Sequence, residues 1–347
     1  MTVSLTVADL KAAGLLGTDK PLASCYDLAL VDLDGVTYQG ALPIAHAADG
    51  LTAARAAGLR LTFVTNNASR VPDDVANQLT SLDIPTQPQE VVTSAQACAA
   101  LLRTRLEPGA KVLVVGGAGL ITAVKAEGFT VVTSADDTPD AVAQGFAPTV
   151  AWTHLAEAAY AVAAGAWFVA SNLDMSLPQT RGYAPGNGAL AAAVQAATGV
   201  APANSGKPGP AMYELAVARA GAANPLVIGD RLDTDLAGAR SAGFAGLHVL
   251  TGVSSARDDI LANPTMRPHY VGADLRVLAE PQPAPVKTGD GWWQVEGRAA
   301  RVTAGRLELD RQGPQGINAV RAACAAAWEA ADAGHTLDES TLPQFTA

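Results

Sequence analysis

Residues 27–37 read DLALVDLDGVT, an apolar run that ends in two aspartates and a glycine. The short apolar run 27–33 predicts a buried β-strand. Asp32 and Asp34 stand two positions apart, so on a strand they project from the same face. At the carboxyl end of a parallel strand, such side chains lie where α/β sheets bind ligands. A pair of aspartates in a turn is equally compatible with a solvated loop, and the rest of the chain has to decide between the two.

The residues after this stretch alternate between helix and strand patterns. Residues 46–59 have helical spacing that ends near Gly58, and residues 59–65 (LRLTFVT) return to a strand pattern. Strand, helix and strand at this spacing predict a right-handed parallel βαβ unit. The alternation resumes after residue 110, and a second α/β unit is expected at roughly residues 86–200.

The C-terminal part of the chain follows a different pattern. Residues 280–287 (EPQPAPVK) contain three prolines and predict a linker, because proline interrupts helices and central strands. Residues 292–297 and 300–310 then predict two strands, and residues 317–334 predict one helix. This tail is too small to be an independent enzyme.

Length and charge limit the classes of function. The 347 residues suit about two domains and an appendage. The formal net charge of −10 disfavours nucleic acid as a partner, because such binding relies on neutralising phosphates. The longest apolar run, 158–170, is too short to span a bilayer, and no secretion signal is evident, so no membrane is expected. The separated Cys25, Cys98 and Cys324 favour a reducing, cytoplasmic location.

Three further segments place polar groups where predicted strands end. Thr65 and Asn66 follow the second strand, and their hydroxyl and backbone N–H groups suit phosphoryl oxygens. Lys207 stands between a glycine and a proline, just before a helix. Residues 229–235 (GDRLDTD) end a third apolar strand and bring three more carboxylates, Asp230, Asp233 and Asp235. Because the exits of parallel strands meet at one edge of a sheet, these groups are expected to form one site.

The phrases DLDGVTY, VTNNASR, GKP and GDRLDTD, in this order, resemble the motifs of the haloacid dehalogenase superfamily of phosphotransferases. The resemblance covers about residues 25–275. It is specifically to the branch with phosphatases of phosphoglycolate, pyridoxal phosphate, nucleotides and glycerol phosphate. It implies an α/β fold with a doubly wound, Rossmann-like parallel-sheet core, an inserted α/β cap and a small α+β appendage. The expected bounds are 1–85 and 200–280 for the core, 86–199 for the cap and 281–347 for the appendage.

The resemblance also implies a role for each motif residue. Asp32 would attack phosphorus to give an aspartyl phosphate, and Asp34 would act as general acid and then general base. Thr65, Asn66 and Lys207 would bind the phosphoryl group. The ligands of an Mg²⁺ cofactor would be Asp32, the main-chain carbonyl of Asp34 and Asp230, with Asp235 in support.

The substrate implied is a small phosphorylated metabolite. The alanine-rich composition and the C-terminal extension are most similar to phosphatases of glycerol 3-phosphate. Phosphoglycolate, pyridoxal phosphate and nucleotides stay as alternatives. Asn172, Asp174 and Arg181 follow the last strand of the second unit and are candidates for selecting the leaving group. The alternative is that this loop, with Gly186–Gly188, only shapes the turn and the start of the next helix. Capped members of this family often pair through their caps, which leaves a homodimer open.

Several weaker signals have plainer interpretations. Asp233 could bind metal, but a capping or solvated role is favoured. The glycine-rich turn at 116–119 suggests nucleotide binding but lacks the third glycine of the dinucleotide fingerprint, so a plain turn is favoured. The five histidines lack metal-ligand spacing and are interpreted as surface or cap residues. Trp292 and Trp293 are assigned to strand packing rather than to a binding platform.

Four other functions are compared with the motifs. A phosphomutase or phosphotransferase would share the aspartyl phosphate, and a dehalogenase has no use for an acid at Asp34. A CoA-binding module in the tail would use residues 311–316, but their spacing does not match the usual loop and Pro314 lacks an N–H. A silent scaffold conflicts with the intact catalytic positions.

Overall fold

The structure of the chain is a computed structural model, which describes residue 10 and residues 14–179, 181–311, 316–343 and 345. Its contacts divide the chain into two units. The first unit combines the described parts of Met1–Leu61 and Ala220–Ala347, and the second is Thr62–Arg219. Both units contain parallel strands connected by helices, so the expected α/β class is confirmed.

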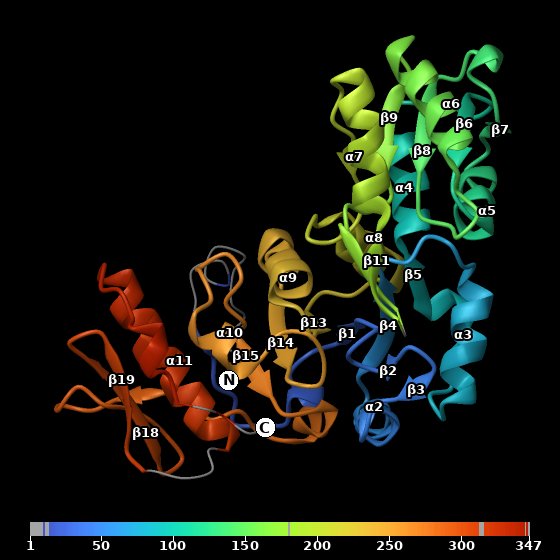
Figure 1. Cartoon of the computed structure of the whole chain (residues 1–347). Helices are drawn as coiled ribbons and strands as arrows, with labels where there is room; N and C mark the ends of the chain where they lie inside the picture. Colours follow the sequence, from blue (N-terminus) through green and yellow to red (C-terminus); the bar gives the residue numbers. More distant parts are fainter. Residues whose placement is uncertain (1–9, 11–13, 180, 312–315, 344, 346–347) are drawn as a thin grey trace. The chain divides into compact units, whose positions relative to one another are not determined.

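The first unit is built on parallel strands in the order β15-β14-β13-β1 (Figure 1). Val31 pairs with Ile228, and Gly229 pairs with His248, so neighbouring strands end close to one another. Every residue of these strands is buried, as expected for a parallel sheet that is covered on both faces. The strands are β1 (Leu28–Val31), β13 (Pro225–Gly229), β14 (Ala245–Val249) and β15 (Tyr270–Gly272).

Helices and short turns of the first unit follow these strands. A hairpin comes after β1, and a π-helix leads directly into α9 after β13. The elements are β2 (Tyr38–Gln39), β3 (Leu42–Pro43), α2 (Ala47–Ala56), π-helix η4 (Leu232–Leu236), α9 (Ala237–Ala242) and α10 (Ala256–Ile260), with 3-10 turns η1 (Leu22–Ser24) and η5 (Leu275–Ala279).

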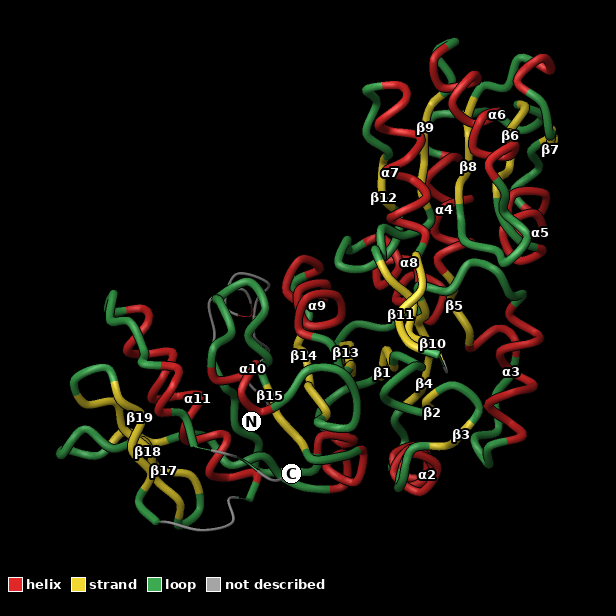
Figure 2. Tube along the Cα trace, viewed as in Figure 1, coloured by secondary structure: helices red, strands yellow, loops and turns green. Residues whose placement is uncertain are grey.

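The C-terminal region, residues 281–347, contains an antiparallel sheet in the order β16-β17-β18-β19, against which α11 packs (Figure 2). The strand expected at 292–297 is confirmed by β17, whereas the prediction of a single strand over 300–310 was wrong. Ala304 and Gly305 have φ values of 49° and 78° and form a tight turn that divides residues 300–310 between two strands. The elements are β16 (Val286–Lys287), β17 (Trp293–Val295), β18 (Arg298–Thr303), β19 (Arg306–Leu309), α11 (Ile317–Asp332) and η6 (Glu339–Thr341).

The second unit contains the parallel pair β4–β5 and a five-stranded parallel sheet in the order β12-β9-β8-β6-β7. Helices α4 and α5 pack together, as do α6 and α7. The elements are β4 (Arg60–Thr65), α3 (Pro72–Ser81), η2 (Pro88–Glu90), β5 (Val91–Thr93), α4 (Ser94–Arg103), β6 (Lys111–Val115), α5 (Ala118–Ala126), β7 (Thr130–Val132), η3 (Ala135–Asp137), β8 (Ala141–Gln144), α6 (Trp152–Ala163), β9 (Trp167–Ala170), β10 (Ser176–Gln179), β11 (Gly182–Pro185), α7 (Asn187–Thr198), β12 (Ala203–Asn204) and α8 (Ala211–Ala220).

The boundaries between the two units differ from the domain bounds that the sequence predicted. It assigns the loop after β4 and the segment around Lys207 to the second unit. The bounds 1–85, 86–199 and 200–280 therefore stay a prediction. Among the described residues, no helix is both long enough and apolar enough to cross a membrane.

Candidate active site

Asp32 directly follows β1, and its position is set by the parallel pairing of that strand. Its backbone N–H donates to the carbonyl of Ile228 at 2.9 Å, so the alignment of β1 with β13 continues to the aspartate. Asp32 is half-buried, whereas Asp34 is exposed. Between these two carboxylates and the next hairpin, Gly35 adopts a φ of +85°, a conformation that favours glycine.

Asp230 follows β13 and is fully buried. Its Oδ2 accepts a hydrogen bond from the backbone N–H of Val253 at 2.7 Å, and its carbonyl accepts one from Ser254 N at 3.0 Å. The loop after β14 therefore encloses this aspartate. It can do so only because Gly252 has no side chain: a Cβ there would lie 1.9 Å from Asp230 Oδ2.

Asp235 lies on the π-helix that follows β13 and is buried. Its Oδ2 accepts a hydrogen bond from the backbone N–H of Arg231 at 3.2 Å, which turns the carboxylate back toward the end of the strand. A π-turn widens the helix and often occurs at functional sites. Here it places the fifth residue after Asp230 beside that aspartate.

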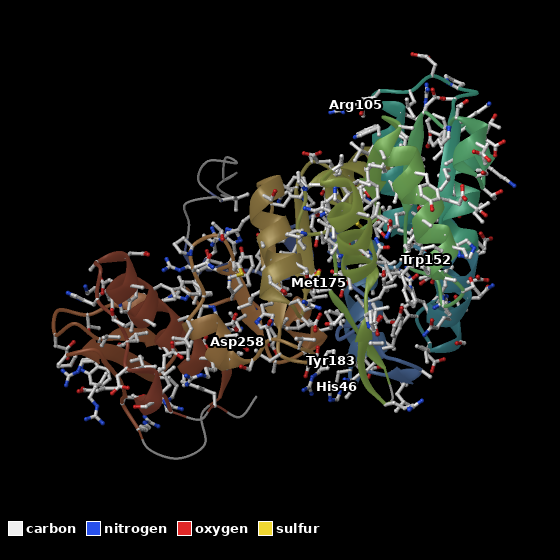
Figure 3. The ribbon with its side chains drawn as sticks, turned by 45° about the horizontal axis from the view of Figure 1, so that its top comes forward. His46, Arg105, Trp152, Met175, Tyr183 and Asp258 are labelled. Atoms are coloured by element: carbon white, nitrogen blue, oxygen red, sulfur yellow. The ribbon has the colours of Figure 1, made fainter. Side chains whose placement is uncertain are left out.

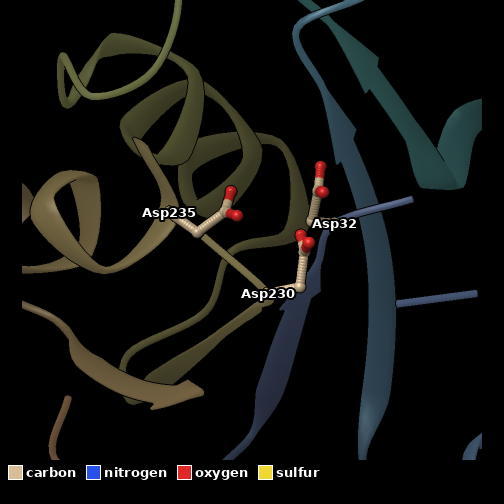
Figure 4. A group of neighbouring side chains, drawn as sticks. All are labelled: Asp32, Asp230 and Asp235. Carbon is tan, nitrogen blue, oxygen red and sulfur yellow. The ribbon is translucent and has the colours of Figure 1, made fainter. Parts of the chain in front are cut away.

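The structure brings Asp32, Asp230 and Asp235 together (Figure 4). One carboxylate oxygen of each lies within 4.8 Å of those of the other two. Three acidic groups so close repel one another, and a bound cation would offset that repulsion. A set of carboxylate oxygens suits a hard divalent cation such as Mg²⁺. The residues present therefore fit the metal that the motifs imply.

Two other aspartates of these motifs lie outside that group of carboxylates. Asp34 is exposed two residues beyond Asp32, and its backbone forms a bridge to Tyr38. The carboxylate of Asp233 is bound by Arg231 through two hydrogen bonds, of 3.1 and 2.8 Å, and its side chain is 60% exposed. This agrees with the solvated role that the sequence favoured for Asp233.

The remaining motif residues lie in the second unit and contact one another there. Thr65 Oγ1 accepts a hydrogen bond from the backbone N–H of Asn67 at 3.1 Å. The side chain of Asn66 binds the segment of Lys207 twice, since Oδ1 accepts from Lys207 N at 2.9 Å and Nδ2 donates to Lys207 O at 3.4 Å. Lys207 is buried, and its Nζ donates to the carbonyl of Val64 at 3.2 Å. Asn66 therefore fixes the backbone that carries the lysine.

The three specificity candidates lie in different environments. Asn172 is buried, and its Nδ2 donates to the carbonyl of Asn66 at 2.7 Å. Asp174 accepts from Asn66 Nδ2 at 3.2 and 3.3 Å. Both residues thus connect the loop after β9 to the loop after β4. Arg181 is exposed at the turn of the β10–β11 hairpin.

Exposed apolar side chains lie on and beside the same hairpin. Tyr183 on β11 is 78% exposed, and Met175, which precedes β10, is 63% exposed (Figure 3). The sequence did not predict these two residues as site candidates, because single apolar residues in a loop have no periodicity. Together with Arg181 they give the hairpin a mixed apolar and cationic character.

Two interpretations of the sequence can be tested within single units. The turn at Gly116–Gly119 is filled by the chain itself: Gly119 N donates to Ser69 O at 3.1 Å, and a Cβ on Gly117 would lie 3.0 Å from that oxygen. A plain turn is therefore the correct interpretation. In the tail, Arg301 stacks on Trp292, in line with the packing role expected for that tryptophan. Residues 312–315, from the segment 311–316 that was set aside as a CoA loop, lie outside the described residues.

The interpretation of all five histidines as surface or cap residues was wrong for two of them. His248 and His269 are fully buried. Burial and the nearby Arg240 lower the pKa of His269 to about 4. Burial also lowers the pKa of His248, but the charge and hydrogen bond of Asp259 outweigh it, so that pKa lies above its ordinary value. A histidine inside an apolar strand run was the available signal, but its partner cannot be read from one sequence.

Comparisons with known proteins agree with this geometry. Residues 29–130 match the family model described as haloacid dehalogenase-like hydrolase, and residues 204–278 match a second, HAD-hydrolase-like model. The chain is 45% identical to the D-glycerol 3-phosphate phosphatase of Mycobacterium tuberculosis over 90% of its own length and 88% of that protein's length. It belongs to the haloacid dehalogenase-like hydrolases.

Other members of the haloacid dehalogenase-like hydrolases support the same placement. A crystal structure of a glycerol phosphate phosphatase from Mycobacterium tuberculosis in complex with magnesium is 44% identical, with a TM-score of 0.82, covering 89% of this chain and 92% of that one. The acid sugar phosphatase of Staphylococcus aureus is 36% identical over 72% of this chain and 95% of its own length. These matches confirm the expected haloacid dehalogenase fold with its cap.

Proposed function

We propose that this chain is an Mg²⁺-dependent phosphomonoester hydrolase that converts glycerol 3-phosphate to glycerol and phosphate. The observation that carries the proposal is the group of Asp32, Asp230 and Asp235 at the ends of parallel strands, with carboxylate oxygens within 4.8 Å of one another. The choice of glycerol 3-phosphate rests on the 45% identity to a D-glycerol 3-phosphate phosphatase over most of both chains.

The reaction would proceed in two steps. A carboxylate oxygen of Asp32 attacks phosphorus, the bond from phosphorus to the glycerol oxygen breaks, and the proton of Asp34 passes to that oxygen. Asp34, now a carboxylate, takes a proton from water while the water oxygen attacks the aspartyl phosphate. The bond between Asp32 and phosphorus breaks, and inorganic phosphate leaves. The exposure of Asp34 leaves its carboxyl group accessible for both proton transfers.

The residues that would hold Mg²⁺ are Asp32, the main-chain carbonyl of Asp34 and Asp230, with Asp235 in support. The ion would offset the charge that gathers when a phosphate dianion meets these aspartates. Lys207 and the hydroxyl of Thr65 are proposed to bind the phosphoryl oxygens. Asn66 would act on that group through the backbone of Lys207, to which it makes two hydrogen bonds. Among the specificity candidates, we favour Arg181, because Asn172 is buried against Asn66.

The decisive experiment measures phosphate release from a panel of phosphomonoesters: glycerol 3-phosphate, phosphoglycolate, pyridoxal phosphate, mononucleotides and sugar phosphates. We expect the highest kcat/KM with glycerol 3-phosphate, and loss of activity in Asp32→Asn. The matched control is Asp233→Asn, an exposed aspartate of the same motif set, which should retain activity. Full activity of pure Asp32→Asn would refute the nucleophile, and phosphate transfer to a sugar hydroxyl without release would indicate a phosphomutase.

The same proposal includes a cytoplasmic homodimer. Cys25, Cys98 and Cys324 are unpaired thiols, as in proteins of reducing compartments. Trp152 and Tyr160 on helix α6 are 75% and 59% exposed (Figure 3 labels Trp152), and large exposed apolar groups often mark contacts with a second chain. Light scattering should show a dimer that Trp152→Asp converts to a monomer.

A further inference from the structure

The C-terminal region shares a hydrophobic core with the rest of the first unit. Ala256 and Ile260 of helix α10 and Val271 of β15 pack with Val320 and Trp328 of α11 in one buried cluster. Both family models end before this region, the second at residue 278. Residues 281–347 are therefore an addition to the family fold that is packed into the unit carrying the three aspartates.

Trp328 connects this region to helix α10 by a directional contact. Its indole Nε1 donates a hydrogen bond to the carbonyl of Asp259 at 2.8 Å, and the residue is 4% exposed. Arg267 stacks on the indole ring with its guanidinium 5.2 Å from the ring centre, and binds both carboxylate oxygens of Asp332 at 2.8 Å. The orientation of Trp328 is thus fixed from two sides.

From Asp259 the contacts lead to the candidate metal site. Asp259 Oδ2 lies 2.8 Å from Nδ1 of His248, and both side chains are fully buried. His248 Nε2 lies 3.1 Å from the carbonyl oxygen of Asp230. A carbonyl only accepts, so Nε2 carries a proton, and one more proton lies between Nδ1 and Asp259. Both ring nitrogens are committed, and the imidazole can neither flip nor turn without losing a bond.

A second route runs along the backbone. The loop of residues 250–255 joins β14 to α10, and Ser255 caps that helix by accepting from Asp258 N. The same loop supplies the N–H groups of Val253 and Ser254 that bind Asp230. A displacement of α10 would therefore change both the backbone donors and the imidazole that hold this aspartate.

A purely structural role explains this arrangement poorly. Burying a histidine and an aspartate together carries a desolvation penalty that an apolar pair of the same volume would avoid. Among the described residues, the side chains of His248 and Asp259 bind each other, and His248 also binds the carbonyl of Asp230. The polar pair is thus placed where it fixes the backbone of an acidic group that, under the proposed function, binds Mg²⁺.

We propose that the C-terminal region positions Asp230 for metal binding through three successive contacts: Trp328 binds Asp259, Asp259 binds His248, and His248 binds Asp230. This inference rests on the proposed function, in which Asp230 is a metal ligand. These three are positioning residues, because none of them reaches the reacting atoms. Groups that orient a metal ligand from behind typically change metal affinity by about 10- to 100-fold.

The test is a calorimetric titration of the full chain with Mg²⁺ alone. Trp328→Phe removes the indole N–H and keeps most of the packing, and we expect Mg²⁺ binding at least about threefold weaker. His248→Leu removes the bond to Asp230 itself and should weaken binding by about tenfold. The matched control is Trp293→Phe, which removes another indole N–H of this region, the one that donates to Glu329 at 3.0 Å. That variant should bind Mg²⁺ within twofold of the wild type.

Kinetics and a double variant separate positioning from mere stabilisation. In Trp328→Phe the Mg²⁺ concentration for half-maximal activity should rise while the KM for the phosphomonoester stays unchanged, and excess Mg²⁺ should restore kcat. Once His248 is leucine, adding Trp328→Phe should weaken Mg²⁺ binding by less than it does in the wild type, since only the backbone route from α10 to Asp230 is then left.

Two outcomes would overturn parts of the argument, and they are distinguishable. If Trp328→Phe and Asp259→Leu lower the melting temperature but leave the Mg²⁺ affinity within twofold, the contacts are structural only and the inference fails. If the wild-type chain itself does not bind Mg²⁺, the proposed function fails first. Should His248→Leu not fold, Asp259→Leu removes the carboxylate that orients the imidazole and gives the same decision.

Discussion

Replacing Gly252 by alanine should disable the metal site without disturbing the fold. A Cβ at this position would lie 1.9 Å from Asp230 Oδ2 and 2.6 Å from Asp230 Cβ. To restore a separation of 3.0 Å, the oxygen must retreat by 3.0 − 1.9 = 1.1 Å and the Cβ by 3.0 − 2.6 = 0.4 Å. Rotation of the side chain cannot move the Cβ, so the backbone of Asp230 has to shift as well. Misplacement of a reacting group by about 1 Å can lower a rate by ~10²-fold.

The assay compares kcat/KM for phosphate release and the Mg²⁺ affinity of Gly252→Ala with those of Gly289→Ala. Gly289 is exposed, and a Cβ added there would meet no other atom within 4 Å, so this position serves as the matched control. We expect a loss of ~10²-fold in kcat/KM for the first variant, about 2.7 kcal/mol in the barrier, and none for the second. Circular dichroism should show both folded. A Gly252→Ala enzyme with Mg²⁺ affinity and kcat/KM within threefold of the wild type would refute the close fit of this loop.

Three further perturbations follow from the structure. Asn66→Ala removes both hydrogen bonds to the backbone of Lys207. It should lower the free energy of unfolding by about 1–3 kcal/mol, measured by chemical denaturation, and should also lower kcat/KM in steady-state kinetics. A variant with wild-type kinetics would contradict the positioning role of Asn66. Chelation of divalent ions should abolish phosphate release, and added Mg²⁺ should restore it and raise the melting temperature, whereas an unchanged rate in chelator would exclude a required metal. Hydrogen bonds from Lys287 and Trp293 lower the pKa of Glu329, and a hydrogen bond from Arg267 lowers the pKa of Asp332. The two carboxylates therefore stabilise the folded state above their ordinary pKa values of 4.5 and 3.8, and this stabilisation is lost as the pH falls through their folded-state pKa values. The protection of backbone amides from hydrogen exchange, relative to their intrinsic rates at each pH, should then fall more in the C-terminal region than elsewhere in the first unit at acid pH, and an equal loss of protection across that unit would contradict this.

The sequence predicted the regular elements that carry a strong pattern. The runs around Leu28–Val31 and Pro225–Gly229 were recognised as strands because continuous apolar residues of that length suit a buried parallel sheet. Strand Ala141–Gln144 was missed, since a short segment with two alanines has little intrinsic preference for a sheet and forms only between β6 and β9. Pairing with distant strands, which supplies its stability, is not written in the local pattern.

In the candidate site, too, the residues within a strong local pattern were predicted and those defined by long-range contacts were not. Asp32 and Asp230 were found because each ends an apolar strand, and Asp235 because it completes a known motif. The contribution of Gly252 and His248 could not be predicted, because each acts by its distance from Asp230, 22 and 18 residues away in sequence. Such contacts depend on how β14 lies beside β13, and no periodicity encodes them.

The pairing of β1 with β13 has a consequence for the synthesis of the chain. Leu28 of β1 aligns with Pro225 of β13, so the strand that pairs with β1 is synthesised 197 residues after it. At ribosomal rates of ~5–20 residues per second, that delay is roughly 10–40 s. Throughout it, the apolar residues Leu28–Val31 lack this partner, while the whole of Thr62–Arg219 emerges and can fold. We expect nascent chains to depend on a chaperone during this interval, and truncated chains that end before residue 225 to aggregate.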